Sequence, residues 1–172
     1  MTKVFYKEEQ KFNQWWIWLL IFFLTGIWLW QLVQQIFLGI PFGNNPTPDY
    51  VVWLTGLFPL LVIILFRVLS LETIINKNGV HYRFIPFQRK AKVIKPTEIS
   101  GFEVKQYKPL KEYGGWGIRT GFGKRSSAYN VSGNQGALFH LKNGKKFLLG
   151  TQNPASIRSA LEKMMRREEI FR

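Results

Sequence analysis

The chain lacks cysteine and has almost no charge over a long stretch near its N-terminus. Without cysteine it cannot form disulfides or thiolate zinc sites, and it has no cysteine nucleophile. This absence fits a reducing compartment. Between Phe12 and Phe66 the only charged residue is Asp49, which is also the only aspartate of the chain. The sequence therefore divides into a very apolar part and a polar part.

Acidic residues are also scarce in the polar part. The net charge is +14, and residues 67–172 hold 21 of the 24 Lys and Arg side chains against 7 Glu. A basic domain beside a bilayer is attracted to anionic lipid head groups. Nucleic acid is the competing partner for a charge of this sign.

Two apolar runs predict a pair of transmembrane helices. Residues 15–38 carry no charge, and roughly 20 residues of helix cross the ~30 Å hydrocarbon core. Tryptophans stand near both ends of this run, as expected for interfacial belts: Trp15, Trp16, Trp18, Trp28 and Trp30. The second run covers residues 50–69, in which Pro59 predicts a kink and Arg67 can snorkel to the interface. We expect a hairpin over residues 15–70, with a connecting loop at 39–49.

The distribution of lysine and arginine predicts the orientation of this hairpin. Three lysines precede the first run, none lies in the loop, and many basic residues follow the second run. By the positive-inside rule both termini are cytoplasmic, which makes residues 1–14 a cytoplasmic tail and the chain a multi-pass protein of the cytoplasmic (inner) membrane. A cleaved signal peptide is disfavoured by the length of the first run and by the lack of a small-x-small cleavage site. A buried hairpin is disfavoured because so small a domain could hardly cover it.

Residues 71–172 have the pattern of a mostly β domain that ends in a helix. Asn78-Gly79 and Asn143-Gly144 each stand between β-rich runs, which is a strong signal for a hairpin. About seven strands are expected in all, among them 92–95, 101–107, 117–122 and 128–132. A closing helix is expected over about residues 154–168, because four apolar residues share one helical face: Ile157, Ala160, Leu161 and Met164.

Three segments carry a resemblance to a known family: Tyr107–Arg119, with its glycines and tryptophan, Ala128–Asn134 and Leu149–Pro154. In these segments the chain resembles bacterial membrane-tethered proteins with a PH-like (pleckstrin-homology-like) domain behind paired helices. The resemblance implies an α+β membrane protein, with a seven-strand β-barrel or sandwich and a C-terminal helix in the cytosol, and it implies no defined biochemical role. The loop between the first two strands is only Asn78-Gly79, so the basic phosphoinositide cradle of eukaryotic PH domains is missing.

No constellation for catalysis, metal or cofactor binding stands out. The glycine-rich segment 114–123 fits neither the phosphate-loop nor the dinucleotide pattern, and either a structural or a functional role stays open for it. His81 and His140 lack further ligands nearby in the sequence. Glu98, Glu103 and Glu112 have no obvious partner base. We expect a protein without cofactor or metal that is not an enzyme.

The basic residues of the polar part are the remaining candidates for a lipid or partner surface. They form a solvated basic face or attract anionic lipid at ~1 kcal/mol per residue. The candidates are Arg89, Lys90, Lys92, Lys108, Lys111, Trp116, Arg119, Lys124, Arg125, Lys145 and Lys146. Trp116 is either an interfacial anchor, a partner contact or a cap on the β core.

Three functions follow from these features. The first is a non-enzymatic membrane-anchored adaptor that presents its domain to a protein partner, for example along a sheet edge, or to the inner leaflet. The second is a tethered nucleic-acid-binding module, which would need aromatic residues for base stacking within the basic face. The third, an uncharacterised membrane enzyme, lacks paired acid and base groups.

Overall fold

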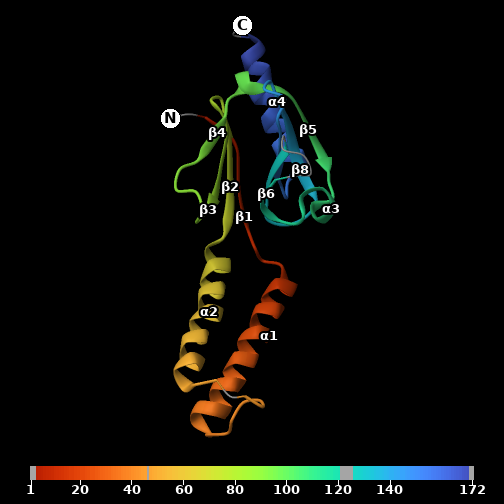
Figure 1. The fold of residues 1–172 in the computed structure, drawn as a ribbon. Coiled ribbons are helices and arrows are strands. Elements are labelled where there is room, and N and C mark those ends of the chain that lie inside the picture. The colour runs from red at the N-terminus through yellow and green to blue at the C-terminus, as the bar shows by residue number, and fades with distance from the viewer. Residues whose placement is uncertain (1–2, 46, 121–125, 171–172) are drawn as a thin grey trace. The chain divides into compact units, whose positions relative to one another are not determined.

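The computed structural model describes the backbone of residues 3–45, 47–120 and 126–170, and side chains as far as residue 166. It contains two compact units: a helical hairpin of residues 12–68 and a β domain of residues 1–11 and 69–172. The architecture is α+β, with two apolar helices, two sheets and a C-terminal helix, as the sequence predicted at this level (Figure 1).

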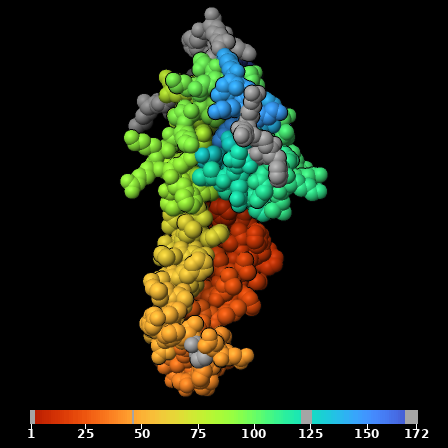
Figure 2. Space-filling view, in the orientation of Figure 1, coloured from red at the N-terminus to blue at the C-terminus, as the bar shows by residue number. Residues whose placement is uncertain are grey.

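The helical hairpin consists of two antiparallel helices. Helix α1 spans Trp15–Leu32 and continues into the π-helix η1, Val33–Phe37, and α2 spans Asp49–Val68 with Pro59 inside it. The helices lie side by side in Figure 2. At the open end the rings of Phe12 and Phe66 are 5.7 Å apart. Closer to the connecting loop, Trp28 Nε1 donates to the Val52 carbonyl at 3.0 Å, and the Trp28 ring occupies the space that a Cβ on Gly56 would need.

Most side chains of the hairpin are not covered by the chain itself. Both helices are long and apolar enough to cross a membrane. Within α1 and α2 the buried residues are Ile17, Ile21, Leu32 and Val52. Phe58, in the middle of α2, is 69% exposed. A core hairpin of a soluble protein would have these side chains buried, so an exposed apolar surface of this extent calls for an apolar partner or medium.

The β domain has two sheets. Among the described strands, the first sheet has the antiparallel order β1-β2-β3-β4, and the second has the order β5-β8-β9-β7-β6, in which β7 and β9 run parallel and the other neighbours antiparallel. The elements are β1 Val4–Lys11, β2 Ser70–Asn76, β3 Gly79–Ile85, β4 Lys92–Ile94, η2 Pro96–Glu98, β5 Ile99–Gln106, α3 Pro109–Tyr113, β6 Gly117–Thr120, β7 Ser126–Asn130, β8 Gln135–Leu141, β9 Lys146–Gly150 and α4 Pro154–Ile170.

Strand β1 lies where the sequence analysis expected a cytoplasmic tail. It pairs with β2 along its whole length and belongs to the β domain. Its buried positions are Tyr6, Glu8 and Gln10. Two of these three residues are polar, so the alternation of apolar and polar residues that marks a half-buried strand is absent from this segment. The remaining strands follow the expected segments, which brings the described strands to nine instead of about seven.

Both Asn-Gly hairpins are present. In the first, Asn76 is paired with Gly79, so the turn itself is Lys77-Asn78. In the second, between β8 and β9, Gly144 has a φ of 76°, which glycine adopts without steric cost. The strand expected over 117–122 is β6, which ends at Thr120, and residues 121–125 lie outside the described part of the chain.

The core of the β domain lies between the sheets. Tyr82 of β3 contacts Tyr129 and Phe147 of the second sheet, with ring centroids 5.0 and 4.7 Å away. Helix α4 buries the predicted face of Ile157, Ala160, Leu161 and Met164, which confirms that amphipathic pattern. Its neighbours include β1, β2, β5 and β8.

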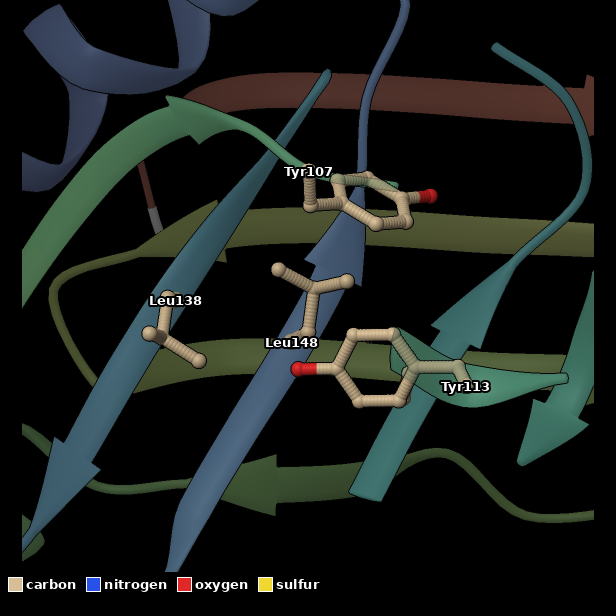
Figure 3. Packing of buried hydrophobic residues seen from close by; sticks show 5 residues of the cluster. Tyr107, Tyr113, Leu138 and Leu148 are labelled. Atoms are coloured by element: carbon tan, nitrogen blue, oxygen red, sulfur yellow. The ribbon is translucent and has the colours of Figure 1, made fainter. Parts of the chain in front are cut away.

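The second sheet also has a buried patch on its other face. Tyr107, which precedes helix α3, and Tyr113, the last residue of α3, pack with Ala128, Leu138 and Leu148 (Figure 3). The segment containing the glycines and tryptophan therefore folds over this face of the sheet, and it buries apolar side chains there.

Candidate interaction surface

One end of the β domain is defined by the points where the chain enters and leaves the helices. Strand β1 ends at Lys11, four residues before α1 begins, and β2 begins at Ser70, two residues after α2 ends. Lys11 pairs with Ser70, and Ser70 pairs with Ile85 at the end of β3. The turn after Ile85 therefore lies at the end of the first sheet that continues into both helices.

The second sheet presents a matching end. Gln10, next to Lys11, donates from Nε2 to the Gly150 carbonyl at 2.7 Å. Gly150 pairs with Gly136 at the start of β8. The Tyr107 amide donates to the Asn134 carbonyl at 2.8 Å, which places the segment after β5 there as well. We call residues 86–90 and 107–117 together the helix-proximal rim.

Four of the predicted basic residues are exposed on this rim. Arg89 and Lys90 lie in the turn after β3, and Lys108 and Lys111 lie at the start of and within helix α3. Trp116 is half-buried at the same end, where its Nε1 donates to the Gly133 carbonyl at 3.0 Å. Residues that are far apart in the sequence thus lie at the same end of the domain, because the register of two different sheets places them there.

The other predicted basic residues do not join this group. Lys145 and Lys146 lie at the opposite end of the second sheet, after the β8–β9 turn. Lys92 Nζ contacts the Tyr129 hydroxyl at 3.4 Å and its ring face at 5.9 Å. Arg119 is an exception: its Nε donates to the Trp116 carbonyl at 2.9 Å, so its guanidinium lies beside the rim. Lys124 and Arg125 lie outside the described residues.

Two exposed apolar side chains lie among the basic residues of the rim and were not singled out from the sequence. Phe87 is 65% exposed and Leu110 is 67% exposed, the highest values among the large apolar residues that the structure describes in the β domain. The position of Phe87 directly after Pro86, in a turn, was a usable signal for exposure. Leu110 offered none, because an isolated leucine in a short segment has no periodicity to assign its face.

Local hydrogen bonds fix helix α3 and hence Leu110. The Glu112 carboxylate accepts the Lys108 amide at 2.7 Å. At the other end Gly114, with a φ of 69°, donates from its amide to the Leu110 carbonyl at 3.1 Å, as a left-handed cap does. Buried Tyr107 lies beneath, and burial raises its pKa to about 12, so its hydroxyl stays neutral.

The glycines at 114–117 have a structural reason. Gly114, Gly115 and Gly117 have φ values of 69°, 123° and 111°, which side-chain-bearing residues rarely adopt. The Gly117 amide donates to Asn130 Oδ1 at 2.8 Å, and Asn130 Nδ2 donates to the Tyr107 hydroxyl at 2.9 Å. This part of the glycine-rich segment therefore forms a tight path from α3 to β6.

A buried carboxylate joins the N-terminal strand to the start of the C-terminal helix. Glu8 Oε2 accepts the Tyr6 hydroxyl at 2.6 Å and the Thr151 hydroxyl at 2.9 Å, and Oε1 accepts the Gln152 amide at 2.7 Å. Burial, and secondarily the hydrogen bond to Glu8, raise the pKa of Tyr6 well above its usual range. This network holds β1, and with it the chain that leads into α1.

The histidines and remaining acidic candidates lie in separate places. His140 Nε2 is 3.9 Å from Glu103, which also pairs with Lys105 at 3.0 Å, and the hydrogen bond from Lys105 is the main cause that lowers the pKa of Glu103. His81 Nε2 is 3.2 Å from Asn76 Oδ1. Over the part of the chain that the structure describes, no three His, Asp or Glu side chains are grouped as a metal site would require.

Glu98 Oε2 accepts the Lys95 amide at 2.8 Å and thereby caps the short helix η2. The arrangement offers a basic and apolar surface at one end of the domain, whereas Glu8 and Glu98 accept backbone amides elsewhere in the fold. Comparisons of the chain with models of known protein families, with curated proteins and with solved structures found no match.

Proposed function

We propose that this protein is a non-enzymatic, membrane-anchored interaction module. Its helical hairpin spans the cytoplasmic membrane twice, both termini are cytoplasmic, and the β domain presents its surface to anionic lipid or a protein partner. The exposure of the apolar helices supports this most directly, because side chains such as Phe58 and Leu57 stay 69% and 53% exposed.

Several features of the hairpin favour insertion into lipid. Helical segments satisfy all their backbone hydrogen bonds internally, as hydrocarbon requires. The Arg67 guanidinium lies 5.2 Å from the centre of the Trp18 ring, and Trp18 Nε1 donates to the Phe12 carbonyl at 2.9 Å. An arginine and a tryptophan together at one end of a hairpin suit the membrane interface.

A PH-like domain is the fold class that we propose for residues 69–172 together with β1. Two facing sheets closed by a C-terminal helix support it, as does the position of the segments that carry the sequence resemblance. Tyr107–Arg119 forms α3 and most of β6, and Leu149–Pro154 links β9 to α4. The additional strand β1 and the parallel pairing of β7 with β9 distinguish this domain from the plan of seven strands.

The contacts of the acidic residues support a non-enzymatic role. Glu8, Glu98 and Glu112 accept backbone amides, and Glu72 forms an ion pair with Arg83 at 2.5 Å. A general acid or base must instead face a site where a substrate can bind. These carboxylates are used to hold strands, turns and helix starts.

Membrane fractionation tests the proposal. The full chain is expected to stay with the membrane after washes with high salt and with alkaline carbonate, and to be released only by detergent. Release by either wash would overturn the integral anchor. Crosslinking in native membranes, followed by identification of the crosslinked species, then separates lipid from protein partners.

A further inference from the structure

We propose that the helix-proximal rim is a lipid-contact surface. Phe87 and Leu110 enter the head-group layer of the cytoplasmic leaflet, and Arg89, Lys90, Lys108 and Lys111 bind the phosphates of anionic lipids. This inference rests on the proposed membrane anchor, and it assigns the partner and the residues of the domain's surface.

The first observation is the location of the exposed apolar side chains. Phe87 follows strand β3 of the first sheet and Leu110 follows strand β5 of the second, yet both lie at the end where the chain continues into the helices. These two side chains are 65% and 67% exposed. Moving such large apolar side chains out of water is favourable. A membrane interface accepts such side chains when basic residues surround them.

The second observation is charge. The rim segments 86–90 and 107–117 contain four Lys and Arg and one acidic residue, Glu112. The Glu112 carboxylate is engaged by the Lys108 amide at 2.7 Å. Each lysine or arginine close to an anionic leaflet is attracted to it and stabilises binding. The rim is thus complementary to anionic head groups.

The third observation is the length of the covalent connections. Ser70 follows the last residue of α2 by two positions, and Lys11 precedes the first residue of α1 by four. A chain extends by at most about 3.6 Å per residue, so the two connections reach no further than about 7 and 14 Å. The head-group region is about 5–7 Å deep on each side of the hydrocarbon. The connections therefore keep this end of the domain close to the head groups of an inserted hairpin.

The fourth observation is that the rim is held in shape. The Phe87 ring stacks on the ring of Phe84 with centroids 6.2 Å apart. The Gln88 amide donates to the Phe84 carbonyl at 2.9 Å, and the Phe84 amide donates to Gln88 Oε1 at 3.2 Å. With α3 capped at both ends, neither apolar side chain requires much ordering when it binds, which favours affinity.

The opposite end of the second sheet provides a control of equal charge. Lys145 and Lys146 are exposed there, and each carries the same charge as Lys108 or Lys111. Asn143, in the adjoining β8–β9 turn, is also exposed. Replacing Lys145 and Lys146 by glutamine changes the total charge by the same amount as replacing Lys108 and Lys111, but it leaves the rim intact.

Environment-sensitive fluorescence of the full chain in lipid nanodiscs tests the proposal. Because the protein has no cysteine, a single label can be attached at Leu57→Cys, Leu110→Cys or Asn143→Cys. The nanodiscs contain either phosphatidylcholine alone or phosphatidylcholine with phosphatidylglycerol, and a quencher attached to the lipid reports proximity. We expect quenching at position 57 in both lipids, at position 110 mainly with anionic lipid, and at position 143 in neither.

Charge variants sharpen the test. The double variant Lys108→Gln with Lys111→Gln should change the equilibrium between molecules whose rim contacts lipid and molecules whose rim is free. We expect the ratio of the first to the second to fall by roughly 30-fold, the effect of two lysines near an anionic surface. Lys145→Gln with Lys146→Gln should leave quenching at position 110 unchanged. An equal loss in both double variants would overturn the assignment to the rim.

The remaining outcomes separate the two proposals. If position 57 is not quenched, the anchor itself is refuted. If position 57 is quenched but position 110 behaves like position 143, the anchor stands and the lipid-contact surface is refuted. If position 110 is unquenched by lipid and crosslinks to a protein in native membranes, the rim is a protein-binding surface, which also overturns the inference.

Discussion

The helical hairpin and the β domain use the same kinds of apolar side chain in opposite ways. Phe58 in α2 is 69% exposed, whereas Phe139 in β8 is 0% exposed. In the β domain, two sheets and α4 bury apolar residues against one another. In the hairpin, two helices that are apolar on all sides can cover only the narrow strip where they meet. Apolar content alone therefore does not define a core, because the arrangement of elements decides whether the protein or its surroundings supply the contacts.

The two regions also differ in chain continuity. The hairpin is continuous, but the β domain is formed from residues on both sides of it. Since Lys11 and Ser70 are paired, the hairpin is in effect a long connection between two neighbouring antiparallel strands. A fragment that begins at residue 71 lacks β1, and with it Glu8 and its hydrogen bonds to the start of α4.

The largest expected effect comes from removing one of the two regions. Replacing residues 12–69 by a two-residue Asn-Gly turn should join β1 to β2 as an ordinary hairpin. We expect a folded β domain that is soluble without detergent, as judged by gel filtration and circular dichroism. The matched fragment 71–172 should be much less stable. Equal stability of the two proteins would show that β1 is not part of the domain.

Single truncations of phenylalanine compare the regions directly. Phe139→Ala should lower the free energy of unfolding of the β domain by about 3–5 kcal/mol, as expected for a buried phenylalanine. Phe58→Ala should leave it unchanged, because that side chain is exposed within the chain. Hydrogen–deuterium exchange of the full chain in detergent measures both. A comparable loss of stability in both variants would contradict the difference in burial between Phe139 and Phe58.

A smaller effect is expected at the carboxylate that joins β1 to the start of α4. Glu8→Ala should cost about 1–3 kcal/mol, because buried donors lose their acceptor. Glu9→Ala is the neighbouring control: its exposed carboxylate forms an ion pair with Lys11 at 3.2 Å, and exposed pairs contribute about 0–1 kcal/mol. Denaturant titration of the β domain distinguishes them, and equal effects would argue against a joining role for Glu8.

Alkaline pH should lower the stability of the β domain, because buried tyrosines of this domain become ionised. Burial raises the pKa of Tyr82 and of Tyr107 from 10.0 to about 12. Because the pKa is higher in the folded state, folding favours the neutral tyrosine. The contribution of each tyrosine to stability is complete below pH 10.0 and is lost as the pH rises towards about 12. The unfolding midpoint should fall over that window, and it should fall less in Tyr82→Phe. An identical pH profile for the variant would show that Tyr82 does not contribute.

The features that could be predicted from the sequence are those with strong local signals. The two apolar helices, both Asn-Gly hairpins and the buried face of α4 each arise from residues close together in the chain. Strand β1 escaped prediction because Glu8 and Gln10 occupy buried positions. Glu8 also accepts a hydrogen bond from nearby Tyr6, but the other partners, Thr151, Gln152 and Gly150, lie more than a hundred residues away.

The rim shows why the candidate surface could only be predicted in part. Its basic residues were identified from composition, but the sequence could not separate Lys108 and Lys111 from Lys145 and Lys146. That separation depends on which end of each strand lies where the chain continues into the helices, and therefore on the pairing of Ser70 with Lys11 and Ile85. Long-range register of this kind has no local signature.

The most direct test of the central claim is the accessibility of single cysteines in intact cells. A membrane-impermeant maleimide should label Asn44→Cys in the connecting loop without disrupting the membrane. It should label Asn143→Cys in the β domain only after the membrane is permeabilised, and Leu57→Cys in α2 only after the protein is denatured. Labelling of Asn143→Cys in intact cells, or of Leu57→Cys in the native protein, would contradict a hairpin that crosses the bilayer with the β domain on the cytoplasmic side.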